Sequence, residues 1–472
     1  MNEKDRYEAI VIGSGQGGTP LATALSKSGM KTALVEMRHV GGTCVNYGCT
    51  PTKTMISSAR VAHLLHRAAE YGVALGSNGN RVDLGVVRRR KRDIVASFRG
   101  GSERNISQSK NLTLLRGRAT FVDSHTIAVR AESGESTVIE APRIFINTGT
   151  RPHVPDLPGL SEVGYLDNET IMELDTVPEH LVVIGGGYIG VELGQMFRRF
   201  GSKVTIVQRQ AKLLPREDDD ISDAVAELLR SEGAEVIVGA EPLSIAKPAG
   251  VSPGERTSIQ LELRENGKAR TVSGSHVLFA AGRTPNSDGI GLEEIGIKLD
   301  GHGYITVNER LETGVPGVWA LGDVKGGPAF THISYDDYRI LYRNVVEGAS
   351  ASIAGRLVPY TVFIDPQLGR VGMSEREARA AGRKIRVASM PMSWVARALE
   401  TDESVGLMKA VVDTESNQIL GFSMLGIEAG EVAGAVQIAM MGKLPYTALR
   451  DGVFSHPTTL ESLNNLFAQL TE

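Results

Sequence analysis

The two cysteines of this 472-residue chain, Cys44 and Cys49, lie in the segment GGTCVNYGCTPTK with four residues between them. In a regular helix their Cα atoms would be about 8.6 Å apart, beyond the roughly 4.4–6.8 Å that a disulfide spans. Gly48 and Pro51 instead predict an irregular turn across residues 44–49, followed by a helix that begins near Pro51. Cys49 would then lie near a helix N-terminus, which favours a thiolate. The pair is either a redox-active couple or two packed, unbonded cysteines.

A candidate acid–base group lies near the other end of the chain, in the segment SHPTTLE. His456 stands five residues before Glu461. A lone histidine is more often structural than catalytic. Here a carboxylate is close enough to orient the ring, and a thiol pair needs a partner for its protons. We therefore expect His456 to be catalytic, with Glu461 as the residue that orients it.

The composition places these residues in an ordinary globular protein. The chain is 41% hydrophobic and 22% charged, with a formal net charge of -4. These values give no reason to expect nucleic acid or an anionic membrane as partner. Two cysteines are too few for a disulfide-stapled secreted scaffold or a cysteine zinc site, and the charged N-terminus resembles no signal peptide. We expect roughly three domains, no metal site, no membrane span and a cytoplasmic location.

The elements that would position the cysteines belong to a repeat. Residues 9–36 align with residues 181–208 without a gap at an offset of 172. Each copy reads as an apolar strand, a glycine-rich turn, a helix and a second apolar strand, which is the β-α-β unit of a dinucleotide site. Its glycines allow a tight turn and the approach of a pyrophosphate to the helix N-terminus. They are Gly13, Gly15 and Gly18 in the first copy, and Gly185, Gly187 and Gly190 in the second.

The two copies differ at the end of the second strand. Glu36 is placed to accept hydrogen bonds from an adenosine ribose, whereas Gln208 and Arg209 occupy the corresponding place in the second copy. The loss of a carboxylate and the gain of an arginine favour a ribose with a 2′-phosphate. The second site is therefore predicted to bind NADP(H); alternatively Arg209 is merely solvated and NADH is accepted too.

Further segments fit around the repeat. FINTGTRP (145–152) and FAAGRTPN (279–286) read as strands that end in glycine turns, and VWALGDV (318–324) reads as a strand that ends at the isolated carboxylate of Asp323. A charge at such a place suggests a ligand hydroxyl as its partner. After residue 350, alternating runs mixed with helical stretches predict an antiparallel sheet with helices in a separate domain.

With these motifs in this order, the chain resembles the flavin-dependent pyridine nucleotide–disulfide oxidoreductases, which include dihydrolipoyl dehydrogenase, glutathione reductase and mercuric reductase. The resemblance rests on GSGQGG, GGTCVNYGCTPTK, GGGYIGVE, AAGRTPN, ALGD and HPTTLE, and it covers nearly the whole chain. It implies an α/β fold with two Rossmann-like dinucleotide-binding domains and a C-terminal α+β dimerisation domain. The implied domains are 1–150 (FAD, first part, with the redox disulfide), 151–280 (NAD(P)), 281–350 (FAD, return segment) and 351–472 (dimerisation).

The resemblance also implies which residues bind the two cofactors. The FAD site would consist of Gly13, Gly15, Gly18, Glu36, Gly42, Thr43, Lys53, Thr148, Gly149, Arg283 and Asp323. The NAD(P) site would consist of Gly185, Gly187, Tyr188, Gly190, Gln208, Arg209 and Gly282, with NADPH preferred and NADH possible.

In the implied reaction the two thiols have different tasks. Cys49 would lie against the flavin as the charge-transfer thiolate, and Cys44 would be the outer thiol that attacks the substrate. His456, held by Glu461, would come from the partner subunit, so that activity would require a homodimer.

Three more residues receive roles from the resemblance. Lys53 and Glu192 would form an ion pair near the reactive nitrogen of the flavin. Tyr188 would cover the flavin until the nicotinamide displaces it. Apart from these three, and independently of the resemblance, His332 follows Asp323 closely and is a weaker candidate for an approach to the flavin.

Departures from the relatives narrow the branch. Mercuric reductase has a tyrosine where His456 stands and a further cysteine pair near its C-terminus, and these differences argue against mercury detoxification. The segments FTHISYDDYRI and ESLNNLF nevertheless look most like a mercuric-reductase-like branch that includes a reactive-chlorine-resistance flavoprotein. The expected function is the transfer of electrons from NADPH, through FAD and the thiol pair, to a small disulfide or other thiol-reactive acceptor. The alternatives are a dihydrolipoyl dehydrogenase that uses NAD+, a reductase of Hg(II) or Cu(II), and a flavoprotein subunit of a larger complex.

Overall fold

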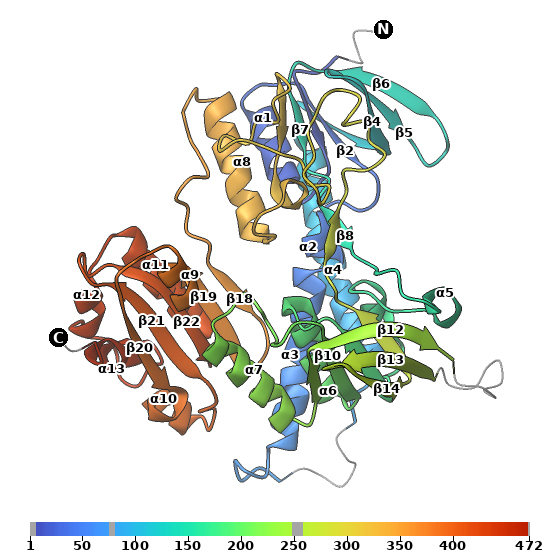
Figure 1. Cartoon of the computed structure of the whole chain (residues 1–472). Helices are drawn as coiled ribbons and strands as arrows, with labels where there is room; N and C mark the ends of the chain where they lie inside the picture. Colours follow the sequence, from blue (N-terminus) through green and yellow to red (C-terminus); the bar gives the residue numbers. More distant parts are fainter. Residues whose placement is uncertain (1–5, 75–80, 248–257, 471–472) are drawn as a thin grey trace. The chain divides into compact units, whose positions relative to one another are not determined.

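The computed structural model describes residues 6–74, 81–247 and 258–470, and the chain forms two compact units (Figure 1). Unit 1 comprises Met1–Thr54, Val86–His153 and Arg283–Arg356, and unit 2 comprises Met55–Gly85, Val154–Gly282 and Leu357–Glu472. The segments predicted to bind FAD thus meet in unit 1, although they are far apart in the sequence. The finer boundaries predicted between the NAD(P)-binding and dimerisation domains stay a prediction.

The centre of unit 1 is a five-stranded parallel sheet with the order β17-β7-β1-β2-β3. Its strands are β1 (Ala9–Ile12), β2 (Thr32–Glu36), β3 (Leu112–Arg116), β7 (Ile144–Ile146) and β17 (Val318–Ala320). β1 and β2 are buried along their whole length, which explains why they read as continuous apolar runs. β1 lies in the middle of the sheet, so the loop that follows it opens at the carboxyl edge, where α/β sheets bind ligands.

Helices and smaller sheets complete unit 1. α1 (Gly18–Lys27) and α8 (Thr331–Val345) pack together over a core that includes Leu21 and Leu341. The other elements are α2 (Gly42–Asn46), the start of α3 (Cys49–His66), α4 (Leu84–Ser107), the antiparallel strands β4 (Arg118–Asp123), β5 (Thr126–Arg130) and β6 (Ser136–Glu140), the pair β8 (Thr150–Pro152) and β16 (Arg283–Pro285), and the 3₁₀ helix η3 (Gly322–Lys325).

Unit 2 contains a second parallel sheet, with the order β11-β10-β9-β15. Its strands are β9 (His180–Ile184), β10 (Lys203–Gln208), β11 (Glu235–Val238) and β15 (His276–Phe279), with the helices α6 (Tyr188–Phe200) and α7 (Asp219–Ser231). β9 has neighbours on both sides, as β1 has in unit 1, so the repeat in the sequence is a repeat in topology. Around it lie α5 (Leu160–Val163), η2 (Thr170–Glu173) and the antiparallel strands β12 (Ala240–Ala246), β13 (Ile259–Glu265) and β14 (Lys268–Gly274).

The C-terminal part of unit 2 is the predicted antiparallel sheet with helices. The strand order is β18-β19-β22-β21-β20, and every neighbouring pair is antiparallel. The strands are β18 (Tyr360–Val362), β19 (Gln367–Gly372), β20 (Ile385–Pro391), β21 (Leu407–Asp413) and β22 (Ile419–Gly426). The helices are α9 (Glu375–Ala380), η4 (Met392–Trp394), α10 (Ala396–Glu400), α11 (Ala429–Met441), α12 (Tyr446–Arg450) and α13 (Ser462–Ala468). The predicted fold class, α/β domains followed by an α+β domain, is confirmed.

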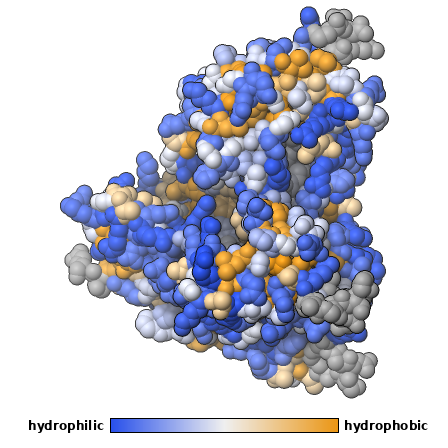
Figure 2. All heavy atoms as spheres, turned by 45° about the vertical axis from the view of Figure 1, so that its right-hand side comes forward, coloured by the Kyte–Doolittle hydropathy of each residue, from blue (hydrophilic) through white to orange (hydrophobic). Residues whose placement is uncertain are grey.

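The face of the molecule in Figure 2 is mostly hydrophilic, with apolar residues in separate patches. Among the residues that the structure describes, none of the helices combines the length and the apolar character needed to cross a lipid bilayer.

Candidate active site

The glycine-rich turns of the two repeats have the same geometry. A β-carbon on Gly18 would lie 2.0 Å from the carbonyl oxygen of Gly13, and one on Gly190 would lie 1.9 Å from that of Gly185. Both distances are far shorter than van der Waals contact, so only glycine lets the helix start this close to the preceding strand. At Gly187 a β-carbon would meet no atom within 4 Å, so the second loop leaves open space at its outer side. Both loops therefore have the form that a bound pyrophosphate requires.

The acidic residue of the first repeat and the glutamine of the second hold these loops in the same way. Glu36 Oε2 accepts hydrogen bonds from the backbone N–H of Ser14, at 3.0 Å, and from the Ser14 hydroxyl, at 2.6 Å. Gln208 Oε1 accepts from the backbone N–H of Gly186 at 3.1 Å. The exchange of glutamate for glutamine thus keeps the bond to the loop and removes the negative charge. Arg209 follows at an exposed position.

Three segments of unit 1 meet around Asp323 in η3. Asp323 accepts from the Thr150 hydroxyl at 3.3 Å, and Arg283 donates from Nε to the same hydroxyl at 2.6 Å. Burial raises the pKa of Asp323, and the nearby Arg283 opposes that shift. Asp323 does not end a strand as predicted, because β17 ends at Ala320 and a 3₁₀ turn follows.

The hydroxyl of Thr148, two residues before Thr150, provides a test of the FAD site. It is buried and has no hydrogen-bond partner within the described residues. A buried hydroxyl without a partner costs free energy, so a ligand group that bonds to it is favoured. Together with the loop before α1 and the carboxylates of Glu36 and Asp323, it fits a dinucleotide such as FAD, which these residues would hold by its phosphates and hydroxyls.

The redox segment is a broken helix. Cys44 lies in the short helix α2, and Tyr47 and Gly48 separate it from α3, which begins at Cys49. The predicted break is present, but the helix starts two residues earlier than expected. The Gly48 carbonyl already accepts a helical bond from Thr52 N at 3.0 Å, and Pro51 lies in the first turn, where a missing N–H costs nothing.

The break brings the two thiols together and next to a third group. Both cysteines are thiols that are not joined in a disulfide; Cys44 is half-buried and Cys49 is exposed. The hydrogen bond with Cys49, together with burial, raises the pKa of the Cys44 thiol, whereas hydrogen bonding to Thr331 lowers it. The Thr331 hydroxyl lies 3.4 Å from Cys49 Sγ. Thr331 is the first residue of α8, which follows η3 and its Asp323.

Sequence reasoning missed Thr331 and singled out its neighbour His332 instead. The His332 ring stacks on Phe330, with ring centroids 5.4 Å apart. A signal was present, because Thr331 opens the next α-helix after the ALGD motif. Nothing in the local sequence, however, indicates which residue at a helix start meets a thiol more than 280 residues away.

The predicted acid–base pair is formed. His456 Nδ1 lies 2.9 Å from Glu461 Oε1 and 3.1 Å from Glu461 Oε2. The histidine side chain is 71% exposed, and that of Glu461 is 21% exposed. Glu461 therefore fixes the ring by one nitrogen and leaves the other turned to the exterior, where it can exchange a proton.

The remaining predicted residues lie in both units. Lys53 belongs to α3 within unit 1, whereas Glu192 is buried in α6 of unit 2 and accepts from the backbone N–H of Phe363 at 2.7 Å. Their ion pair stays a prediction. Tyr188 is the first residue of α6, directly after the loop of the second repeat, and Gly282 ends the segment Val154–Gly282 of unit 2.

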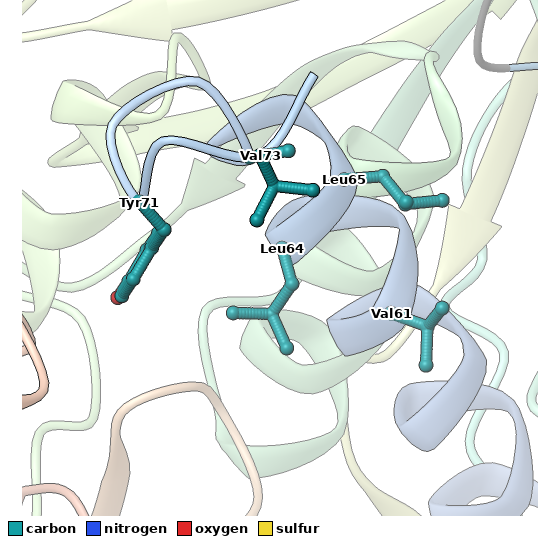
Figure 3. A pocket seen from close by; sticks show the side chains of 6 residues that line it. Val61, Leu64, Leu65, Tyr71 and Val73 are labelled. Atoms are coloured by element: carbon teal, nitrogen blue, oxygen red, sulfur yellow. The ribbon is translucent and has the colours of Figure 1, made fainter. Parts of the chain in front are cut away.

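A further hollow lies on unit 2 at the C-terminal half of α3 (Figure 3). It measures about 310 Å³ and is lined by Val61, Leu64, Leu65, Ala68, Tyr71 and Val73. The Tyr71 hydroxyl is the one polar side-chain group among these lining residues, and it donates to the Thr401 carbonyl oxygen at 2.6 Å. Among the described residues that line it, no group could orient a polar substrate, and we assign the hollow no chemistry.

Comparison with known proteins agrees with this site. The model of the family described as pyridine nucleotide-disulphide oxidoreductase matches residues 7–337, and that of the family's dimerisation domain matches residues 358–467. The chain is 36% identical to the probable pyridine nucleotide-disulfide oxidoreductase RclA of Escherichia coli K12, over 98% of this chain and 99% of that protein. It is 33% identical to a mercuric reductase of Staphylococcus aureus, over 98% of this chain and 82% of the other.

The solved structures give the same result. A Cu(II) complex of the HOCl-induced flavoprotein disulfide reductase RclA from Escherichia coli matches with a TM-score of 0.88 and 36% identity, over 100% of both chains. The predicted branch and the predicted cofactors, FAD and a pyridine nucleotide, are thereby confirmed. The chain belongs to the pyridine nucleotide-disulphide oxidoreductases, enzymes that use both cofactors.

Proposed function

We propose that the enzyme takes electrons from NADPH and delivers them, through FAD and the Cys44–Cys49 pair, to a small disulfide or other thiol-reactive acceptor in the cytoplasm. The observation that carries this proposal is the thiol pair itself. The two cysteines hydrogen-bond to each other and lie beside Thr331, in the same compact unit as the carboxylates of Glu36 and Asp323. Arg209 supports NADPH, since it stands where a 2′-phosphate would be recognised.

The chain's own residues account for the thiol chemistry. FAD, when bound, supplies the acceptor for hydride and the donor of two electrons to the Cys44–Cys49 disulfide. The Cys44 thiolate then attacks one sulfur of a disulfide acceptor and releases the other as a thiol. Cys49 attacks Cys44 in the mixed disulfide, which releases the second thiol and restores the internal disulfide.

His456 and Glu461 would manage the protons of these steps. The carboxylate holds Nδ1 of the ring, so Nε2 is the atom that would protonate each departing thiolate. As part of the proposal, His456 acts on the thiols of the second subunit of a homodimer. Lys53 and Glu192 would pair near the flavin, and Tyr188 would cover it until the nicotinamide binds.

Anaerobic titration with NADPH tests the proposal. The reduced enzyme should show a long-wavelength charge-transfer band after uptake of about two electrons per flavin, because the Cys49 thiolate lies against the oxidised flavin. Cys44→Ser should show the band before any reductant is added, and Cys49→Ser should never show it. Absence of the band from the wild type, or equal spectra of the two variants, would contradict the assignment.

The choice of substrate needs separate assays. NADPH should reduce the flavin at lower concentrations than NADH does, and turnover of dihydrolipoamide with NAD+ should be slow. Fast lipoamide turnover would instead identify a dihydrolipoyl dehydrogenase.

A second candidate activity is the reduction of Cu(II), favoured by the match to a Cu(II) complex of RclA. The described residues contain no cluster of three or more histidine, cysteine or acidic residues that could hold a metal ion. We therefore propose that copper would be a substrate at the thiols. Cu(II)-stimulated oxidation of NADPH that disappears in Cys44→Ser would establish it, and stimulation that persists would exclude the thiols from it.

A further inference from the structure

A buried hydrogen-bond network holds Tyr188 at the start of α6. The Tyr188 hydroxyl donates to Glu217 Oε1 at 3.1 Å, and the Tyr360 hydroxyl donates to the same oxygen at 2.6 Å. The two tyrosine rings lie with their centroids 5.4 Å apart. Because every member belongs to unit 2, this arrangement is complete within one compact unit.

The carboxylate of Glu217, which accepts these two bonds at Oε1, is also held at its second oxygen. Glu217 is 1% exposed, and its Oε2 receives a hydrogen bond from Arg370 Nη1 at 3.2 Å. Arg370, in β19, also donates to the Tyr360 hydroxyl at 3.1 Å and to the Arg216 carbonyl oxygen at 3.1 Å, and it pairs with Glu377. The carboxylate is thus immobilised between α6, which carries Tyr188, and the antiparallel sheet, which carries Tyr360 and Arg370.

Tyr188 is the member of the network that stands next to the nucleotide loop. It is half-buried, and it follows Gly187, where open space adjoins the loop. Burial, followed by the charge of Glu217, raises the pKa of Tyr188 to about 12, so its hydroxyl keeps the proton that it donates. A hydrogen bond from a hydroxyl to a carboxylate is stronger than one between neutral groups.

We propose that Glu217 is a positioning residue for nicotinamide binding: its carboxylate holds the hydroxyl of Tyr188, sets where the tyrosine ring rests, and opposes the movement that admits the nicotinamide. This inference rests on the role of Tyr188 in the proposed function. Glu217 itself touches neither substrate nor cofactor. It acts through the tyrosine, and Arg370 keeps it in place.

Removal of the Tyr188 hydroxyl alone tests the inference. Tyr188→Phe keeps the ring, breaks the bond to Glu217 and leaves that oxygen bonded to Tyr360. We expect the dissociation constant of NADPH, from the concentration dependence of flavin reduction after rapid mixing, to fall by about five- to tenfold. The rate of reduction at saturation should change by less than about twofold, because the bond opposes binding and not hydride transfer. NADH should show the same fold-change, since the two nucleotides share the nicotinamide.

Tyr360→Phe is the matched control. It removes a hydroxyl that bonds to the same carboxylate oxygen and to Tyr188, but it leaves the bond from Tyr188 to Glu217 intact. The dissociation constant of NADPH should therefore stay within about twofold of the wild type. Equal effects of the two substitutions would mean that any disturbance of Glu217 alters nucleotide binding, and would overturn the inference. Glu217→Gln should act in the direction of Tyr188→Phe. Flavin content and thermal unfolding establish that each variant is folded.

Tyr188→Ala separates this inference from the proposed function. If the alanine variant changes NADPH binding and Tyr188→Phe does not, the ring controls access but Glu217 does not hold it, so the inference fails alone. If neither variant changes binding, the role of Tyr188 is wrong, and the inference falls with it. If neither NADPH nor NADH reduces the wild-type flavin, the proposed function itself fails.

Discussion

The thiol pair depends on a hydroxyl that a different helix supplies. Thr331 hydrogen-bonds to Cys49 Sγ at 3.4 Å, and its hydrogen bond lowers the pKa of Cys44. A donor to the charged form of a group stabilises that form. At the scale of single residues, Thr331 thus opposes the effects of burial and of the neighbouring thiol, both of which keep Cys44 protonated.

We expect Thr331→Val, which has nearly the same shape but no hydroxyl, to raise the apparent pKa of the thiol pair. The thiolate then forms at higher pH. The charge-transfer absorbance of the two-electron-reduced enzyme, followed against pH, measures the shift. Thr331→Ser keeps the hydroxyl and should titrate like the wild type. An unchanged titration of the valine variant would show that the hydroxyl does not act on the thiolate.

At the scale of elements, the two β-α-β units share one local geometry and differ in the residues at the end of the second strand. In each, the helix starts so close to the preceding strand that a β-carbon on the third glycine would lie within 2.0 Å of a carbonyl oxygen. The first copy positions Glu36, and the second positions Gln208 and Arg209. The same local geometry therefore recurs, and in the proposed function the residue at the end of the second strand distinguishes the FAD site from the NAD(P) site.

This duplication predicts a pair of selective defects. Gly18→Ala should push α1 away from β1 and lower the flavin content of the purified protein severalfold. Gly190→Ala should leave flavin content near the wild-type level but slow its reduction by NADPH at least about tenfold, since the displaced loop lies in the other unit. Flavin absorbance and anaerobic reduction kinetics measure the two effects, and each variant is the control for the other. Loss of flavin from both variants would show that the two units do not act separately.

At the scale of the whole molecule, the exposed apolar surface of the C-terminal domain indicates a second subunit. Large apolar side chains remain exposed in this part of the single chain, and domains of this family dimerise here. Examples are Ile438 at 71%, Met441 at 67% and Val453 at 101% relative exposure. His456 is three residues beyond Val453 and shares its exposure to the exterior.

Mixed dimers of two inactive variants test whether the site is shared. Cys44→Ser and His456→Gln should each lose most disulfide-reducing activity. When both are co-expressed, about half of the dimers combine the two chains, and one site of each such dimer holds an intact thiol pair and an intact histidine. About a quarter of wild-type activity should therefore return. The purified variants mixed without subunit exchange are the control, and no recovery in co-expressed dimers would place His456 and the thiols in one chain's site.

The sequence by itself determined the local features of this protein. The glycine patterns, the apolar strands and the spacing of the cysteines are consequences of backbone geometry over short distances, so the two β-α-β units, the broken helix and the His456–Glu461 pair could be predicted. The start of α3 at Cys49 was missed, because a proline is tolerated throughout the first helical turn.

Tertiary structure alone decided which distant groups meet. Thr331 reaches Cys49, Thr150 bonds to Asp323, and Glu217 joins Tyr188 to the antiparallel C-terminal sheet. These side chains come from segments that no periodicity links, and each is ordinary in its own sequence context. Their contacts arise from strand order and helix packing, which depend on the summed burial of the whole chain rather than on any one segment.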